Sequence, residues 1–426
     1  MLDRIRSLLI TLLILAIGFS PRIPLGIFIP GRRFDLRIVD IVLVVICLFW
    51  ILYLMMRPYL HLTSLAKPIG LYLGICFITT FLSLVFLSRV SLLRSFFYFL
   101  KEVEYFLIFF VVANWVSSKN ALLRGLQAII VSGLANVSWV VYQLISGKNG
   151  PLFKFLTPEG AFDRPRIFAS YGPTLIGEAS PLSIACFFSF LFLLSLCCAY
   201  FWTAKRKLFF LLAFLFLPCA LLSGTKMSLG LILVGGFVLL LRFKMKRKIF
   251  FFLFILTLLM FISGGLLYHI PIAGRAFHFK SYLTAIFQER LLFVWKPIFF
   301  ASLNYFLTGV GKGAVVLPGF GFVDETHCHY LKVFIDSGIF GLLAFIVLIL
   351  SVIKLSWKIG LRSRFIFTKI FSAATLGIIV SLAIAAVYHD VFRPFVPNEL
   401  LWVFIGLACA SWRIERKSLQ NSNGIV

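Results

Sequence analysis

Apolar blocks as long as a bilayer is thick follow one another along the whole chain, separated by short polar segments. A helix of roughly 20 apolar residues crosses the hydrocarbon core of a membrane, and the pattern predicts about twelve such helices. They fall near residues 7–20, 38–56, 68–88, 93–115, 124–145, 175–200, 207–223, 227–242, 249–268, 329–353, 366–388 and 398–412. Short segments of alternating polarity, which are typical of a membrane β-barrel, do not occur. We therefore expect an all-α polytopic membrane protein with a single transmembrane domain over residues 1–426.

The composition agrees with this prediction. Of the 426 residues, 61% are hydrophobic and 13% are charged, which is more apolar surface than a soluble domain can bury. Every cysteine except Cys328 falls inside an apolar block, where it behaves as a small hydrophobic residue. The sequence therefore predicts no disulfide framework.

Positive charge predicts the orientation of the helices, because Lys and Arg are enriched in the cytoplasmic loops of membrane proteins. The densest clusters lie at 205–207, 242–248, 354–369 and 413–417. With twelve helices these clusters share one face with both termini, and we expect that face to be cytoplasmic. The first block then stays in the protein as a membrane helix, since no small-residue cleavage site follows it.

Two long segments, 147–173 and 269–326, lie on the opposite face in this topology. Segments of this length in compact proteins are often functional. The second contains a helical-looking piece at 281–303, which we expect to lie at the membrane interface or to pack on the bundle. The same face carries many Lys and Arg residues. They fit either long translocated loops that escape the charge rule or a surface that binds an anion such as a lipid pyrophosphate.

The segment DETHCHYL (324–331) brings together residue types that bind zinc: two acids, two histidines and a cysteine. Structural zinc ligands come in separated pairs, however, and no second pair is present in the sequence. On a helix His327 and His329 would also face different directions. We therefore expect no metal and no cofactor. A polar loop at a helix end and a catalytic group remain as the two interpretations.

From His327 the chain reads His-Cys-x-Tyr-Leu-x-x-Phe-x-Asp-x-Gly-x-x-Gly-Leu. This resembles the signature of the O-antigen ligase and polymerase family, bacterial membrane glycosyltransferases that use glycans linked to undecaprenyl pyrophosphate. In that signature the histidine precedes Asn or Ser and the acid is Glu, whereas this chain has Cys328 and Asp336. His327, rather than His329, occupies the histidine position of the family.

Three further segments are similar to segments of that family, so the resemblance covers about the C-terminal two-thirds of the chain. ERLLFVWKPIFFASLNYFLTGVGKG (289–313) matches an Arg-x-x-x-x-Trp motif and a Gly-x-Gly motif through Arg290, Trp295, Gly309, Gly311 and Gly313. DRPRIFASYGPT (163–174) is similar to an arginine segment of the first loop, with Arg166 as the better fit and Arg164 as the fallback. SGTKMSLG (223–230) resembles a turn in which Lys226 stands where an arginine is common.

The resemblance implies a metal-independent, inverting transfer of a glycan from the lipid pyrophosphate to a sugar hydroxyl. Such a reaction needs a base with a pKa near neutrality and cations that hold the departing pyrophosphate. The resemblance implies that His327 and Arg290 are the catalytic pair. For pyrophosphate binding it suggests Arg166, Arg164, Lys226 and Lys312, and for supporting roles Trp295, Asp336, Glu178 and His329. The last external loop, YHDVFRPF (388–395), adds His389, Asp390 and Arg393 as weaker candidates for acceptor contacts.

The expected partners are the undecaprenyl-pyrophosphate-linked oligosaccharide, an acceptor glycan and the lipid bilayer, with no nucleic acid. The expected location is the bacterial inner membrane, with the active site on the periplasmic face. A polymerase is favoured slightly over a ligase that transfers glycan to lipid A core, because RIPLGIFIPGRRFDLRIVDIVL (22–43) looks like the N-terminal region of polymerases. A transporter is disfavoured, since the sequence shows no inverted repeat.

Overall fold

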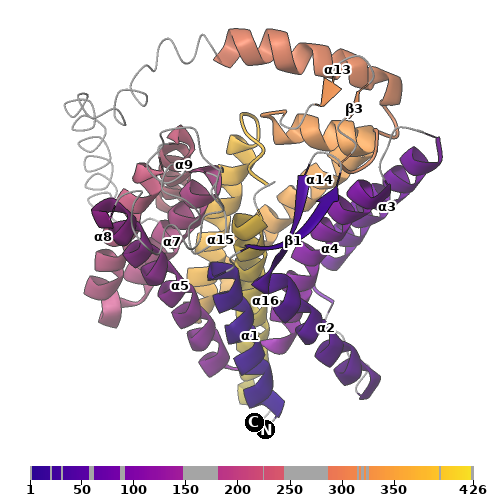
Figure 1. Cartoon of the computed structure of the whole chain (residues 1–426). Coiled ribbons are helices and arrows are strands. Elements are labelled where there is room, and N and C mark those ends of the chain that lie inside the picture. The colour runs from indigo at the N-terminus through magenta and orange to yellow at the C-terminus, as the bar shows by residue number, and fades with distance from the viewer. Residues whose placement is uncertain are drawn as a thin grey trace.

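The computed structural model describes residues 2–19, 22–29, 32–56, 62–86, 92–146, 181–223, 225–243, 286–313, 316–317, 321–322, 326–392 and 395–423. Long helices dominate this part of the chain (Figure 1). The first half contributes α1 (Leu2–Gly18), α2 (Ile38–Met56), α3 (Ala66–Phe86), α4 (Leu92–Trp115) and α5 (Lys119–Ser146). The second half contributes α7 (Pro181–Phe201), α8 (Arg206–Leu222), α9 (Lys226–Phe243), α14 (His329–Arg362), α15 (Ile366–Ala385) and α16 (Phe395–Asn423).

Each predicted membrane helix that falls in the described residues overlaps one of these helices, while 249–268 lies outside them. Within the described residues, six helices are long and apolar enough to cross a membrane: α2, α3, α5, α7, α14 and α15. The other long helices in the described part of the chain are shorter, more polar or more charged. The membrane class of the fold is therefore supported, and the number of twelve helices stays a prediction.

The exposed surface of the bundle is strongly apolar. Leu48 on α2 is 58% exposed and Phe81 on α3 is 57% exposed. Only 22% of the apolar stretch of α2 is buried, against 94% for α7, so α2 lies at the rim and α7 in the interior. In water an apolar rim of this size would be unfavourable, whereas lipid chains cover it without cost. The apolar helices thus indicate a bilayer environment.

Small residues let the interior helices approach each other closely. A Cβ atom added at Gly377 of α15 would lie 3.2 Å from the carbonyl oxygen of Gly235 on α9. Close approach through glycine is a common way for membrane helices to pack, because hydrophobic burial does not drive their association within lipid.

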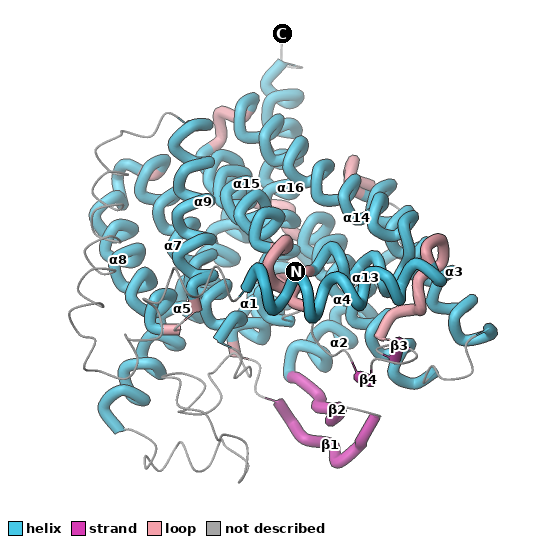
Figure 2. The backbone as a smooth tube through the Cα atoms, turned by 90° about the horizontal axis from the view of Figure 1, so that it is seen from above, coloured by secondary structure: helices cyan, strands magenta, loops and turns pink. Residues whose placement is uncertain are grey.

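Two short hairpins add to the mainly helical architecture that the sequence predicts. β1 (Arg22–Ile29) pairs antiparallel with β2 (Arg32–Arg37), with Arg22 opposite Arg37 and Ile29 opposite Arg32. This hairpin follows α1 and precedes α2 in the chain, and it lies at the rim of the bundle beside α2 (Figure 2). β3 (Val316–Leu317) and β4 (Gly321–Phe322) form the second pair. The first hairpin was not predicted from the sequence, because Pro24 and Gly26 are uncommon inside strands and the hairpin lies between two strong helical patterns.

A short helical segment lies across the end of the bundle opposite to the two chain termini (Figure 1). It consists of the π-helix η3 (Ile286–Trp295), α13 (Lys296–Ser302) and the single turn η4 (Leu303–Tyr305). We call this end of the bundle the α13 end. Ile298 is only 3% exposed and packs with Val310 and Ile335, whereas Phe300 on the other side is 58% exposed. The segment therefore packs on α14 with one face and presents an apolar face outward.

Candidate functional site

The break in α14 positions the loop that follows α13. Gly338 has φ 65° and ψ −168°, values that interrupt the helix. The interruption frees two carbonyl groups for other partners. Val310 donates its backbone N–H to Ile335 at 2.8 Å, and Gly311 donates to Asp336 at 2.9 Å. The loop at 309–311 is thereby fixed on the broken helix.

Glycine is required on both sides of the contact between the 309–311 loop and the break in α14, which we call the glycine joint. Gly309 has φ 64°, and a Cβ atom there would lie 2.5 Å from the backbone nitrogen of Gly338. Only glycine adopts such left-handed conformations without strain at so close an approach. The Gly-x-Gly motif and the Asp-x-Gly motif of the family resemblance thus meet in one joint, which holds the segment carrying Arg290 against α14.

Lys312, one residue after Gly311 of the glycine joint, is buried rather than exposed at the surface. Its side chain is 5% exposed, and its ammonium group donates to the Tyr72 hydroxyl at 3.0 Å and to Glu102 at 2.9 Å. A buried lysine of this kind is stable only when its charge is paired, and Glu102 supplies that pairing. In this structure Lys312 therefore anchors the loop to α3 and α4.

Three side chains from separate segments meet at the α13 end, at the start of α14. The rings of His327 and His389 lie 6.1 Å apart between centroids and are nearly perpendicular, at 89°. Arg290 donates from Nη1 to the carbonyl oxygen of Tyr388 at 3.1 Å. Burial, together with the positive charge of Arg290 and the neighbouring His327, lowers the pKa of His389 to about 4. The second imidazole is therefore neutral at neutral pH, between a guanidinium and another imidazole.

The backbone of His327 is held in an unusual conformation. It has φ 52°, the only positive φ of a non-glycine residue in the described part of the chain. Such strain costs free energy, and it persists only when neighbouring contacts enforce it. Those contacts are made by the preceding residue, Thr326. Its carbonyl oxygen accepts a hydrogen bond from Trp295 Nε1 at 2.9 Å, and the Thr326 hydroxyl donates to Asp390 at 3.0 Å. Trp295 thus acts on His327 through the residue that precedes it.

The loop carrying His389 is fixed by backbone hydrogen bonds. His329 donates its N–H to the carbonyl of Ala386 at 2.8 Å, and His389 donates to Ala385 at 3.0 Å. Sequence reasoning gave His389 only as a weaker candidate, and the structure brings it to His327. The available signal was an imidazole in a short loop on the same face as His327. Arg393 of the same loop lies outside the described residues.

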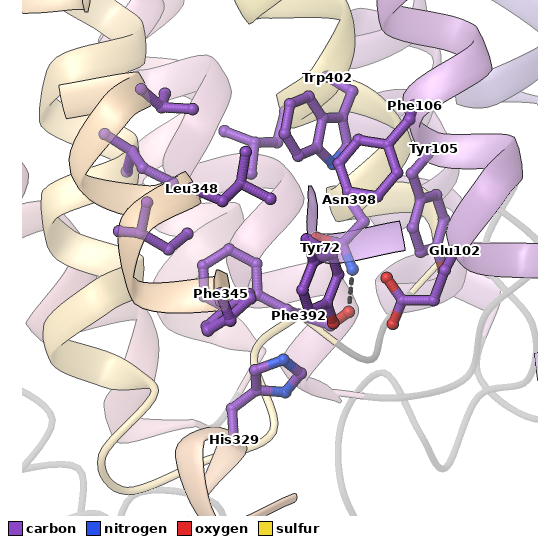
Figure 3. Close-up of a pocket in the computed structure, with 14 residues that line it drawn as sticks. Tyr72, Glu102, Tyr105, Phe106, His329, Phe345, Leu348, Phe392, Asn398 and Trp402 are labelled. Atoms are coloured by element: carbon purple, nitrogen blue, oxygen red, sulfur yellow. Dashed lines mark hydrogen bonds between the residues drawn. The ribbon is translucent and has the colours of Figure 1, made fainter. Parts of the chain in front are cut away.

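His329 lines a small cavity between α3, α4, α14 and α16 (Figure 3). Its ring is 5.2 Å from Phe345 and 5.1 Å from Phe392, and the residue is 7% exposed. The volume open to a water-sized molecule is about 20 Å³, enough for one water molecule. Tyr72, Glu102 and Asn398 also line it. His329 is therefore part of the interior rather than of the His327 cluster.

The remaining candidates divide into two groups. Asp336 pairs with Lys332 one turn earlier in α14, at 2.7 Å, and so stabilises the first half of that helix. Arg164, Arg166 and Glu178 lie outside the described residues, as does the side chain of Lys226 at the start of α9.

Within the described residues, no group of three or more His, Cys, Asp or Glu side chains is arranged to hold a metal ion. Burial and the nearby Asp390 raise the pKa of the Cys328 thiol, so the thiol is neutral in the structure described.

The cluster at the α13 end offers an imidazole that can accept a proton and a guanidinium that can hold an anion. Arg290 is bound to the loop at Tyr388, and His327 follows Thr326, which contacts both Trp295 and Asp390. A comparison with known protein families finds none that matches this chain, and a search of curated proteins finds no similar sequence.

Proposed function

We propose that the protein is a membrane glycosyltransferase that moves a glycan from an undecaprenyl-pyrophosphate-linked donor to a sugar hydroxyl, and that it acts as a polysaccharide polymerase. The observation that carries the proposal is the meeting of His327 and Arg290 beside one short loop, 386–392, although they belong to different segments. These are the two residues for which the motif resemblance implies catalytic roles.

In the proposed reaction the neutral imidazole of His327 takes the proton of the acceptor hydroxyl. The hydroxyl oxygen then attacks the anomeric carbon from the side opposite to the pyrophosphate. The bond between that carbon and the pyrophosphate oxygen breaks, and the anomeric configuration inverts. Arg290 uses one N–H to bind Tyr388, which leaves its other N–H groups to contact phosphate oxygens. A guanidinium stays charged throughout, so it stabilises the leaving group at any physiological pH.

We propose a location in the bacterial inner membrane, with both termini in the cytoplasm and the site on the periplasmic side. α14 begins beside His327 and ends at Arg362, and α16 runs from Phe395 to Asn423. The basic segments 354–369 and 413–417 therefore lie at the far ends of these helices from His327. The α13 end, where lipid-linked glycans would be used, is the less basic end of these two helices, which agrees with the positive-inside rule.

The test is a reconstituted assay. Purified protein in liposomes receives undecaprenyl-pyrophosphate repeat units and EDTA, and polymer length is read on a gel. We expect wild-type protein to extend chains, and His327→Ala and Arg290→Ala to lose at least about 100-fold in rate. Lys358→Ala, an exposed change at the other end of α14, is the matched control and keeps full activity. Chain growth by His327→Ala would overturn the assignment of the base.

The ligase is the second candidate, because it would use the same donor, base and cation. Wild-type protein that is inert with repeat units alone but active when lipid A core is added would show a ligase. A transporter would move the lipid-linked glycan across liposomes without forming a new glycosidic bond, and His327→Ala would leave that movement intact.

A further inference from the structure

We propose that the imidazole ring of His389 acts as a positioning residue that stabilises the protonated form of His327 by presenting its ring face to the edge of the His327 ring. This inference deepens the proposed function, on which it rests for its meaning in catalysis. The pairing itself is a property of the two side chains.

The geometry of the two rings carries the inference. The planes of the two rings make an angle of 89° in a T-shaped pair, in which we assign the face to His389 and the edge to His327. A cation within roughly 6 Å of an aromatic centroid is attracted to the negative face of the ring. The centroids are 6.1 Å apart, and an atom at the ring edge lies closer than the centroid. A protonated His327 thus lies within range of that attraction.

The charges around His327 explain why such help is needed. Arg290 binds the carbonyl of Tyr388, next to His389, so a second cation on His327 would be repelled by the guanidinium. Asp390 accepts a hydrogen bond from the hydroxyl of Thr326, the residue before His327, at 3.0 Å, and its negative charge offsets part of this repulsion. The Cys328 thiol next in sequence stays neutral, because its pKa is raised by burial. The His389 ring, 6.1 Å from that of His327 between centroids, adds a neutral neighbour to this group of charges.

His389 can play this role because it does not compete for the proton. Burial, the positive charge of Arg290 and the neighbouring His327 lower the pKa of His389 to about 4. Between pH 5 and pH 8 its ring is therefore neutral while an ordinary histidine titrates. The backbone bonds from His389 to Ala385 and from His329 to Ala386 keep the ring in place.

The experiment compares three substitutions in full-length protein in nanodiscs. His389→Phe keeps a flat ring face, His389→Leu keeps volume without a face, and His389→Asn keeps polarity without a ring. The protonation of His327 is followed by the pH dependence of deuterium exchange at its C2 position, with fragment ions that separate it from His329. We expect the Leu and Asn variants to lower the pKa of His327 by about half to one unit. The Phe variant should stay within error of wild type.

Equal shifts in the Phe and Leu variants, or no shift in any variant, would overturn the inference. A wild-type pKa of His327 in the His389→Asn variant alone would show that a hydrogen bond, and not the ring face, supports His327. That result would overturn the inference as well. The same variants enter the polymerisation assay, where the acid limb of the rate profile should move to lower pH with Leu but not with Phe. An active His327→Ala protein together with the expected pKa shifts would refute the proposed function while leaving the ring pairing intact. An inactive His327→Ala protein without those shifts would refute the pairing alone.

Discussion

Arg37 and Glu399 form a bidentate ion pair with both side chains buried, Nη1 to Oε1 at 2.7 Å and Nη2 to Oε2 at 3.1 Å. The pair joins the last residue of β2 to the first turns of α16. Next to it, Lys101 of α4 binds Asp40 of α2 and Glu104 of its own helix, each at 2.6 Å. The starts of α2 and α16 and the middle of α4 thus carry two neighbouring groups of ion pairs inside an otherwise apolar bundle.

The first prediction concerns this pair. Arg37→Met or Glu399→Leu alone leaves one buried charge without its partner, and each should lower the free energy of unfolding by about 3–5 kcal/mol. The double variant Arg37→Met with Glu399→Leu replaces both charges by apolar groups and should be far closer to wild type. Thermal unfolding midpoints in detergent, compared across the double-mutant cycle, give the measurement. Additive losses in the double variant would show that the two groups do not act as a pair.

The second prediction concerns the glycine joint. A Cβ atom at Gly338 would lie 2.2 Å from the carbonyl oxygen of Leu307, at a φ of 65°. Gly338→Ala should therefore lower stability by about 1–3 kcal/mol and displace the segment carrying Arg290, with a loss of activity. Gly74→Ala on α3 is the control, because no atom lies within 4 Å of the added Cβ. Unfolding midpoints and the polymerisation rate are read together. Equal unfolding midpoints and equal rates in the Gly338→Ala and Gly74→Ala variants would show that the glycine joint does not hold the segment carrying Arg290 in place.

The helices were predictable because bilayer-length apolar blocks mark them without any knowledge of tertiary contacts. The motif resemblance also pointed to His327 and Arg290, which the fold brings to the same loop. The pairing of Lys312 with Glu102 could not be predicted, since nothing in a local pattern says which distant carboxylate a lysine will meet. The same holds for Arg37 and Glu399. The neutral state of His389 depends on burial and on neighbours from other segments, which the sequence alone does not reveal.

The third prediction separates two roles for Lys312. As a structural anchor, Lys312→Ala leaves the partly buried Glu102, whose side chain is 23% exposed, without its cation and should cost about 1–3 kcal/mol of stability. Adding Glu102→Gln to that variant should restore most of the loss. As a pyrophosphate ligand, Lys312→Ala would keep its stability and raise KM for the lipid-linked donor. Unfolding midpoints and donor KM, measured on the single and double variants, decide between these roles. The ion pair at 2.9 Å favours the anchor.

The fourth prediction concerns acid stability. The pKa of His389 is lowered to about 4 in the folded protein, below the ordinary histidine value of about 6.5 that applies when it is unfolded. Between these values the unfolded chain binds more protons than the folded one, so stability falls as the pH drops from about 6.5 to about 4.

The contribution of His389 to this loss is at most about 3 kcal/mol. His389→Phe cannot titrate, so its stability should fall less than that of wild type over the same pH range. The measurement is the unfolding midpoint of both proteins at several values between pH 4 and pH 8. His389→Asn also lacks the titrating ring and should show the same flattened profile, whatever its stability at neutral pH. A wild-type profile in both variants would mean that the acid sensitivity comes from other groups and that His389 is not held neutral by the fold.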